Sequence, residues 1–250
     1  MDVKMLTISY KIKGLALNEL WFASKLSLSK KKLLGFYCYR DTLVKYPLKA
    51  LKKEVKYTLV NDLTIEEDTI FSSFKSNVRN EIRKCEKIEA FKYSSNYESK
   101  KIFLEFYHRF AEAKSLASIE ERAINKYGKN LFYVSAHLDN SLTNMQVYLV
   151  DKESKIVRLL HSISTLYDEN NKHKRAQIGW INRYLHWQTI LHFKSLNFKT
   201  FDWGGYTNNP NSGLAGIDKF KASFGGKKVE LYNYYTLPYY LIKQIQEKIL

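Results

Sequence analysis

The chain has 250 residues, of which 45% are hydrophobic and 26% are charged, a composition typical of a folded globular protein and not of a disordered one. No apolar run approaches the ~20 residues that span a bilayer, and the two cysteines, Cys38 and Cys85, have no motif spacing. We therefore expect no transmembrane helix, no disulfide scaffold and no cysteine-type zinc site. The net charge of +16 indicates either a solubilising surface or anionic partners, namely nucleic acid, phosphorylated cofactors, acidic carrier proteins or lipid headgroups.

The N-terminal part is basic and has a less regular pattern than the rest. It predicts a strand over Val3–Tyr10, a short helix over Leu15–Ala23, and strands over Gly35–Arg40 and Val55–Val60. Residues 25–56 carry ten Lys and Arg against two acidic residues, so this stretch contributes +8 of the +16. The first residues build no apolar block of the kind found in signal peptides, and we expect a cytoplasmic protein, either free or at the inner face of the membrane.

The segment from Ile65 to Lys87 has the period of one amphipathic helix. Apolar residues recur at three- and four-residue steps and form the expected core-facing stripe: Ile70, Phe74, Val78, Ile82 and Cys85. A second stripe carries three cations at four-residue steps: Lys75, Arg79 and Arg83. Like charges in one column destabilise a helix slightly, so this stripe indicates either a bound anion or a solvated face.

A regular alternation of strands and helices follows Ile88. The predicted elements are a strand at Ile88–Tyr93, helices at Lys100–Leu116 and Ile119–Tyr127, strands at Leu131–Leu138, Asn144–Val150 and Ile156–Ser164, a helix at Gln177–Leu196, a strand at Lys199–Trp203, a helix at Leu214–Ser223, a strand at Lys228–Thr236 and a final helix from Pro238. The three consecutive strands are joined by short polar turns and indicate an antiparallel meander. The order predicts an α/β fold with a mixed central sheet flanked by helices.

The predicted long helix has features of an anion site at its start. Lys172, Lys174 and Arg175 precede it, and Gly179 falls in its first turn. The first N–H groups of a helix are unpaired, and the helix dipole favours negative charge there. A diphosphate is the expected ligand, and an ordinary basic loop is the alternative.

Four sequence blocks resemble bacterial FemAB-like and related envelope acyltransferases, and the element order is that of the GNAT acyltransferase fold. The blocks are Lys75–Lys87, Arg175–Gln188, Phe201–Tyr206 with its Asp-Trp-Gly-Gly, and Gly216–Gly226 with its Gly-Ile-x-x-Phe-Lys-x-x-Phe-Gly-Gly. The resemblance implies an N-acyltransferase that moves an acyl group from acyl-coenzyme A, or from acyl carrier protein, to an amine. The implied acceptor is a small molecule, an amino sugar or amino acid of cell-envelope precursor synthesis.

The chain departs from these families in two respects. FemAB enzymes have two GNAT-like halves, whereas here residues 1–86 are too few for a complete one; we interpret them as a partial half, packed on a GNAT-type domain at 87–250. Trp180 stands where coenzyme A enzymes have a small residue at the pyrophosphate turn. The alternatives are therefore an aminoacyl-tRNA-dependent aminoacyl transferase, or a non-catalytic GNAT-fold module that binds anionic partners, including an anionic membrane surface. DNA binding is not expected.

The candidate catalytic and donor-binding residues lie on the long helix and the strand after it. Gly179, Asn182, Arg183 and His186 form one polar face among apolar residues, which indicates either a cavity lining or structural hydrogen bonding. With Lys174 and Arg175 this face is the predicted donor site, and His186 is a candidate proton carrier. Asp202 ends a strand before two glycines, which suits a base, an acceptor ligand or a turn cap. The resemblance implies that Tyr206 protonates the leaving group.

The candidate acceptor-binding residues are His161, Ser162, Trp203, Lys219 and Lys221. Adjacent residues of a strand point to opposite faces, so His161 and Ser162 are not expected to form a catalytic dyad with each other. Of Lys219 and Lys221, one is expected to bind a phosphate or carboxylate and the other to be solvated. The remaining histidines have no metal-ligand spacing, and we expect no metal.

Overall fold

The computed structural model describes residues 5–26, 28–47, 49–95, 99–167, 169–207 and 209–249. Its strands are β1 Leu6–Ile12, β2 Leu15–Trp21, β3 Tyr37–Thr42, β4 Lys52–Asp62, β5 Phe91–Ser95, β6 Leu131–Leu138, β7 Ser141–Asp151, β8 Ile156–Ser164, β9 Thr200–Tyr206 and β10 Lys227–Tyr235. Its α-helices are α1 Lys30–Leu34, α2 Glu67–Ser73, α3 Ser76–Cys85, α4 Ser99–Ala113, α5 Glu121–Asn125, α6 Lys172–Ser195, α7 Ala215–Ala222 and α8 Leu237–Ile249. Two 3₁₀ turns, Gly128–Asn130 and Thr165–Tyr167, precede β6 and follow β8.

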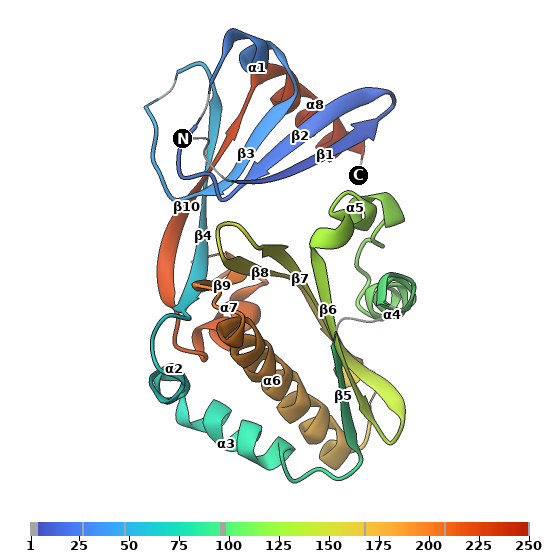
Figure 1. Cartoon of the computed structure of the whole chain (residues 1–250). Coiled ribbons are helices and arrows are strands. Elements are labelled where there is room, and N and C mark those ends of the chain that lie inside the picture. The colour runs from blue at the N-terminus through green and yellow to red at the C-terminus, as the bar shows by residue number, and fades with distance from the viewer. Residues whose placement is uncertain are drawn as a thin grey trace.

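The strands form one mixed sheet in the order β1-β2-β3-β10-β4-β9-β8-β7-β6-β5 (Figure 1). The pairs β2–β3 and β8–β9 are parallel, and the other neighbours are antiparallel. The predicted α/β class with a mixed sheet and flanking helices is confirmed. Because β10 lies between β3 and β4, the two predicted parts of the chain share a single sheet. The domain boundary at residue 86 stays a prediction.

Helices cover both faces of the sheet. Helices α2, α3 and α6 enclose the largest core against β6–β9, and α3 runs beside α6 (Figure 1). Helices α4 and α5 close a second core on the other face, where Phe103 and Phe106 meet Met145, Val147 and Ile163. Helix α8 packs on β3, and α1 lies beside it at the same end of the molecule. None of the described helices combines the length and the apolar character needed to cross a bilayer.

The helix predicted at Leu15–Ala23 is wrong, because the structure has strand β2 there. Lys13 and Gly14 both have positive φ, at 48° and 82°, which is the backbone of a two-residue hairpin turn. This turn pairs every residue of β2 with β1. The turn geometry, and not the spacing of the apolar residues, decides the structure of this segment.

The single helix predicted at Ile65–Lys87 is broken into α2 and α3 at Phe74 and Lys75, whose backbones are extended. The backbone N–H of Lys75 donates to the Ser223 carbonyl over 2.8 Å, which fixes the bend to the end of α7. The predicted apolar stripe is fully buried nonetheless. A tertiary contact therefore interrupts a helix whose core-facing pattern was predicted correctly.

Helix α6 begins earlier than predicted. The Asn171 side chain caps it by accepting from the backbone N–H groups of His173 and Lys174, at 2.9 and 3.2 Å. The predicted basic loop is therefore the first turn of the helix. Gly179 lies seven residues beyond the first helical residue, Lys172, and not in the first turn. The predicted meander, by contrast, is confirmed as β6–β8.

Candidate functional site

The parallel strands β8 and β9 pair over three residues and then separate. The pairing ends at Arg158 and Asp202, while β8 remains paired with β7 as far as Ser164. Where the pairing ends, the Gly204 backbone still lies close to β8. A Cβ atom at Gly204, which has φ +71°, would lie 2.6 Å from the Leu159 carbonyl oxygen, so only glycine allows this close approach. We call this region, Leu159–Ser164 of β8 and Gly204–Tyr206 of β9, the fork. An extended ligand that carries amide groups can pair with the strand edges facing it.

Arg158 joins two buried carboxylates beside the fork. Its Nη1 lies 2.5 Å from Asp202 Oδ2 and 3.1 Å from Asp41 Oδ2. Asp202 also accepts from the Thr58 hydroxyl over 2.5 Å and from the Gly204 N–H over 2.8 Å. Burial raises the pKa of Asp41, an effect that Arg158 opposes. We call Asp41, Arg158 and Asp202 the ion cluster; it connects β3, β8 and β9 and leaves one net negative charge.

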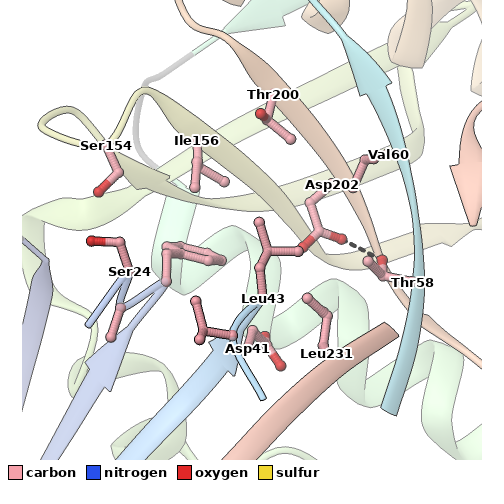
Figure 2. Close-up of a pocket in the computed structure, with 13 residues that line it drawn as sticks. Ser24, Asp41, Leu43, Thr58, Val60, Ser154, Ile156, Thr200, Asp202 and Leu231 are labelled. Atoms are coloured by element: carbon pink, nitrogen blue, oxygen red, sulfur yellow. Dashed lines mark hydrogen bonds between the residues drawn. The ribbon is translucent and has the colours of Figure 1, made fainter. Parts of the chain in front are cut away.

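A pocket of about 410 Å³ opens over the ion cluster, between the β3–β4 segment and the central strands (Figure 2). The polar residues of its lining are Asp41, Asp202, Thr58, Thr200, Ser24 and Ser154. The remaining wall is mainly apolar and includes Phe22, Leu43, Val44, Val60, Ile156 and Leu231. Apolar walls with a few convergent polar groups are the usual lining of a small-molecule site. The net negative charge of the ion cluster favours a ligand with a cationic or hydrogen-bond-donating group.

Lys221 extends from α7 to the fork, where its Nζ donates to the Gly205 carbonyl over 2.6 Å. Partial burial, followed by the positive charge of Arg158, lowers its pKa to about 8, and Asp202 and Asp218 oppose this shift. A lysine with such a pKa has a substantial neutral fraction at physiological pH and can accept a proton. Lys219, on the same helix, is exposed. The structure therefore places Lys221 at the fork and Lys219 in solvent.

A chain of neutral polar groups lies on the α6 face of β7 and β8. The Tyr148 hydroxyl donates to Gln146 Oε1 over 2.7 Å and contacts His186 Nδ1 at 2.9 Å. Because its single hydrogen is used on Gln146, His186 Nδ1–H donates to Tyr148, and His186 Nε2 is left as an acceptor. The Ser162 hydroxyl has two acceptors within reach, Asn182 Oδ1 at 3.3 Å and that Nε2 at 3.5 Å, and its single hydrogen points to one of them at a time. We call these five residues the neutral chain.

Burial keeps His186 uncharged. The side chain is fully buried, and burial, followed by the charges of Lys221 and Arg183, lowers its pKa to about 3. An imidazole with this pKa stays in its neutral form, with one N–H, at neutral pH. The geometry therefore gives His186 the role of orienting the exposed Ser162 hydroxyl at the fork, and not that of a general base.

His161 and Ser162 face opposite sides of the sheet, as expected. The His161 ring packs against Phe103 and Tyr107 of α4, and burial lowers its pKa to about 4. Ser162 faces α6 instead. His161 thus belongs to the fork strand, but its side chain packs against α4 and faces away from Ser162.

The predicted donor residues do not converge on one point. The Lys174 ammonium pairs with Asp139 at 2.8 Å in the first turn of α6. Arg183, more than two turns further along, pairs with Glu81 at 3.0 Å and lies over the Phe220 ring. Arg175 is exposed, and Gly179 receives the Arg183 guanidinium on its carbonyl. The α6 N-terminus and the Gly179–Arg183 segment are thus separate locations.

Two cations of the predicted stripe, Arg79 and Arg83, have side-chain partners within the protein. Lys75 lies at the bend between α2 and α3, and Arg79 donates to the carbonyls of Ser72 and Phe74 at the end of α2. Arg83 lies over the Phe71 ring, 5.4 Å from its centre. The structure thus assigns the three cations to the α2–α3 connection, away from the fork.

The two aromatic candidates of β9 have different environments. Trp203 is fully buried, donates to Asn61 Oδ1 over 2.5 Å and packs 4.8 Å from the His186 ring. Tyr206 is half-buried at the end of the fork. Among the described residues, no group of three or more His, Cys, Asp and Glu side chains is arranged to hold a metal ion.

Sequence reasoning missed Arg158, Asp41, Thr58, Tyr148 and Gln146. One signal was available for Arg158, which is a lone charge inside the apolar strand sequence Ile-Val-Arg-Leu-Leu. A charge in such a strand requires a buried counter-charge. The partners could not be identified, because Asp41 and Asp202 lie far from it in the sequence.

No family model and no curated protein sequence matches the chain. Solved structures with a similar fold include FemX, at TM-score 0.63 and 9% identity, over 96% of this chain and 86% of that one. They also include the C-terminal domain of a putative lysylphosphatidylglycerol synthetase from Agrobacterium fabrum, at TM-score 0.56 and 10% identity, over 92% and 80%. A third is L-PGS from Bacillus licheniformis, at TM-score 0.53 and 10% identity, over 92% and 80%. The fold of these proteins, which the resemblance to FemAB-like proteins led us to expect, is confirmed for this chain.

Proposed function

We propose that this chain, which has the GNAT/FemAB-like acyltransferase fold, is an enzyme that transfers an acyl or aminoacyl group to a primary amine at the fork. The observation that carries the proposal is Lys221, held at the fork with a pKa of about 8. When the amine attacks the donor carbonyl, the new C–N bond forms, the bond to the leaving group breaks and the amine loses a proton. Neutral Lys221 accepts that proton.

Other residues contribute by position. Ser162 presents its hydroxyl to the fork, oriented by His186 and Asn182. Asp202 connects the fork to the pocket, since its carboxylate lines the pocket and accepts from the Gly204 N–H. The acceptor amine enters through the pocket, where the negative charge of the ion cluster attracts it. Tyr206, at the end of the fork, is the proposed proton donor to the leaving group.

The first candidate for the donor is a thioester, either acyl-coenzyme A or an acyl group on acyl carrier protein. The proposed acceptor is an amino sugar or amino acid of envelope precursor synthesis. Aminoacyl-tRNA is the second candidate, and a specific observation favours it. Gly179 and Trp180 lie inside α6, so this segment does not supply the free N–H groups that a diphosphate needs. The net charge of +16 suits either an RNA or an acidic carrier protein.

The donor class is tested by thermal unfolding with coenzyme A, acetyl-coenzyme A, a long-chain acyl-coenzyme A and an aminoacyl-tRNA, at two salt concentrations. A ligand at ~100 times its dissociation constant adds about 2.7 kcal/mol to the free energy of unfolding. A saturable shift with an acyl-coenzyme A that survives the higher salt supports the thioester donor. A shift with aminoacyl-tRNA alone supports the second candidate.

Catalysis is tested by Lys221→Met, with Lys219→Met as the matched control on the same helix. We expect Lys221→Met to lower kcat/KM about 10²-fold or more, the usual contribution of a general base, and Lys219→Met to change it little. In the unaltered protein kcat/KM should rise with pH up to about 8, because the neutral form of Lys221 is the active one. Equal kcat/KM of the two variants would mean that Lys221 is not the base, and an absence of turnover in the unaltered protein would favour the non-catalytic binding module.

A further inference from the structure

Four exposed apolar side chains lie together where α1 and α8 meet. Leu34, the last residue of α1, is 81% exposed. Leu237, Leu241 and Ile245 are spaced four residues apart on α8 and are 53%, 54% and 58% exposed. Side chains at this spacing share one face of a helix. We call these four residues the apolar stripe.

The two helices are held side by side by the Thr236 backbone and side chain. The Thr236 hydroxyl donates to the Gly35 carbonyl over 2.6 Å, and its N–H donates to the Tyr37 carbonyl over 3.0 Å. Leu34 and Leu237 are each one residue from this contact. The stripe therefore continues from α1 onto α8, and Figure 1 shows both helices at the same end of the sheet.

The stripe is not needed for the packing of α8 on the sheet. That contact is made by the opposite face of the helix, where Tyr239 is buried against Leu17, Cys38 and Tyr235. Apolar side chains more than half exposed on the outer face of an otherwise packed helix mark a surface that contacts something else.

The surroundings of the stripe are strongly basic. Helix α1 begins Lys30-Lys31-Lys32 and has no acidic residue. Strand β4 starts at Lys52, which is exposed and pairs with Tyr235, two residues before α8. Apolar side chains bordered by lysines match an anionic lipid surface, since the side chains enter the boundary of the acyl chains and the ammonium groups contact the headgroups.

We propose that the face formed by α1 and α8 docks on an anionic lipid bilayer. A second copy of the chain would bring the same lysines together and meet repulsion, and an RNA would leave the leucines exposed to water. The proposal goes beyond the transferase function and does not depend on it.

The test is cosedimentation of the purified full chain with vesicles of phosphatidylcholine alone and of phosphatidylcholine with phosphatidylglycerol. We expect binding to the anionic vesicles only, and a part of it that persists at high salt because of the apolar contacts. The double variant Leu241→Gln/Ile245→Gln should lower the partition coefficient about tenfold or more. Lys31→Glu should lower it at least roughly fivefold and mainly at low salt.

Matched controls separate this face from the overall charge and from folding. Leu196→Gln, at the exposed end of α6, and Lys129→Glu, before β6, make the same chemical changes elsewhere. Both should bind vesicles like the unaltered chain, and all variants should keep its thermal midpoint. Equal binding by the double variant, binding to neutral vesicles as strong as to anionic ones, or a dimer in solution that the double variant abolishes would overturn the proposal.

Discussion

The ion cluster and the neutral chain lie on opposite faces of the sheet around β8, and both are buried except at Ser162 and Asn182 of the neutral chain. On one face Arg158 neutralises one of two carboxylates, whereas on the other His186, Tyr148 and Gln146 are satisfied by hydrogen bonds without a formal charge. The two clusters differ in what they tolerate. Removing one charge from an ion cluster leaves a buried ion without a partner, whereas removing one group from a neutral chain leaves only an unsatisfied dipole.

The comparison also separates two roles. The ion cluster joins three distant segments, residues 41, 158 and 202, and sets the field at the pocket and at Lys221. The neutral chain keeps a histidine uncharged and sets the direction of one exposed hydroxyl at the fork. One cluster thus acts through charge and the other through geometry.

The largest effect is expected for Arg158→Met. Breaking a buried ion pair by removing one partner costs about 3–5 kcal/mol, and here it leaves Asp41 and Asp202 without their shared cation. Without Arg158 the pKa of Asp41, already raised by burial, rises further, so the folded variant binds protons that the unfolded chain does not. Its deficit in the free energy of unfolding should therefore be largest at neutral pH and shrink as the pH falls towards 4, measured by urea unfolding.

The double variant Arg158→Met/Asp41→Asn sharpens this prediction. Asparagine tolerates the positive φ of 52° at position 41, so the substitution removes charge without straining the backbone. The double variant should be more stable than the sum of the two single changes implies. Additive effects would mean that Arg158 stabilises the fold without its ion pair to Asp41, through Asp202 and its packing against Trp21.

The next largest effect concerns the pH dependence that His186 contributes. Its pKa is about 3 in the folded protein and about 6.5 when unfolded, so only the unfolded chain binds the proton between these values. Stability from this group is therefore complete above pH 6.5 and is lost as the pH falls towards 3. Between pH 7 and 4.5 the loss should be about 2–3 kcal/mol.

His186→Gln should remove that loss, measured by urea unfolding in a His161→Gln background, because burial of His161 produces a similar dependence. The control is His173→Gln, whose ring is exposed at the start of α6. If His186→Gln leaves the fall in the free energy of unfolding between pH 7 and 4.5 unchanged, the His186 ring is charged in the folded protein. The neutral chain would then be a second ion site, and the contrast between the two faces would disappear.

The sequence predicted the C-terminal part of the fold well because each element there carries its own signal. The meander strands are joined by short polar turns. In one of these turns, Asp139 and Asn140 have the positive φ that a tight hairpin requires. In the N-terminal part the strands β1, β3 and β4 were predicted, whereas β2 was predicted as a helix, since it depends on its pairing with β1 and with β3. The break before α3 depends on a hydrogen bond to Ser223, which no local pattern reveals.

The site was predictable only in part for the same reason. His186, Asn182, Ser162, Asp202 and Lys221 could be proposed from their patterns and motifs, and the structure places all of them at or beside the fork. Their physical states could not be predicted. The low pKa of His186 arises mainly from burial among aromatic residues of β7, β9 and α7, and the partners of Asp202 come from β4 and β8.

The smallest effect is expected for Tyr148→Phe, which deletes one oxygen from the neutral chain. Phenylalanine keeps the packing of the buried ring, so only the hydrogen bonds to Gln146 and His186 are lost. The free energy of unfolding should fall by about 1–2 kcal/mol, and urea unfolding at pH 7 measures it. Without the Tyr148 hydroxyl, His186 Nδ1 has no partner and the ring loses its fixed tautomer. The kcat/KM of acyl transfer should therefore fall without a change in its pH profile. A loss as large as that of Arg158→Met would mean that the hydroxyl carries charge, and a loss near zero would mean that water replaces it.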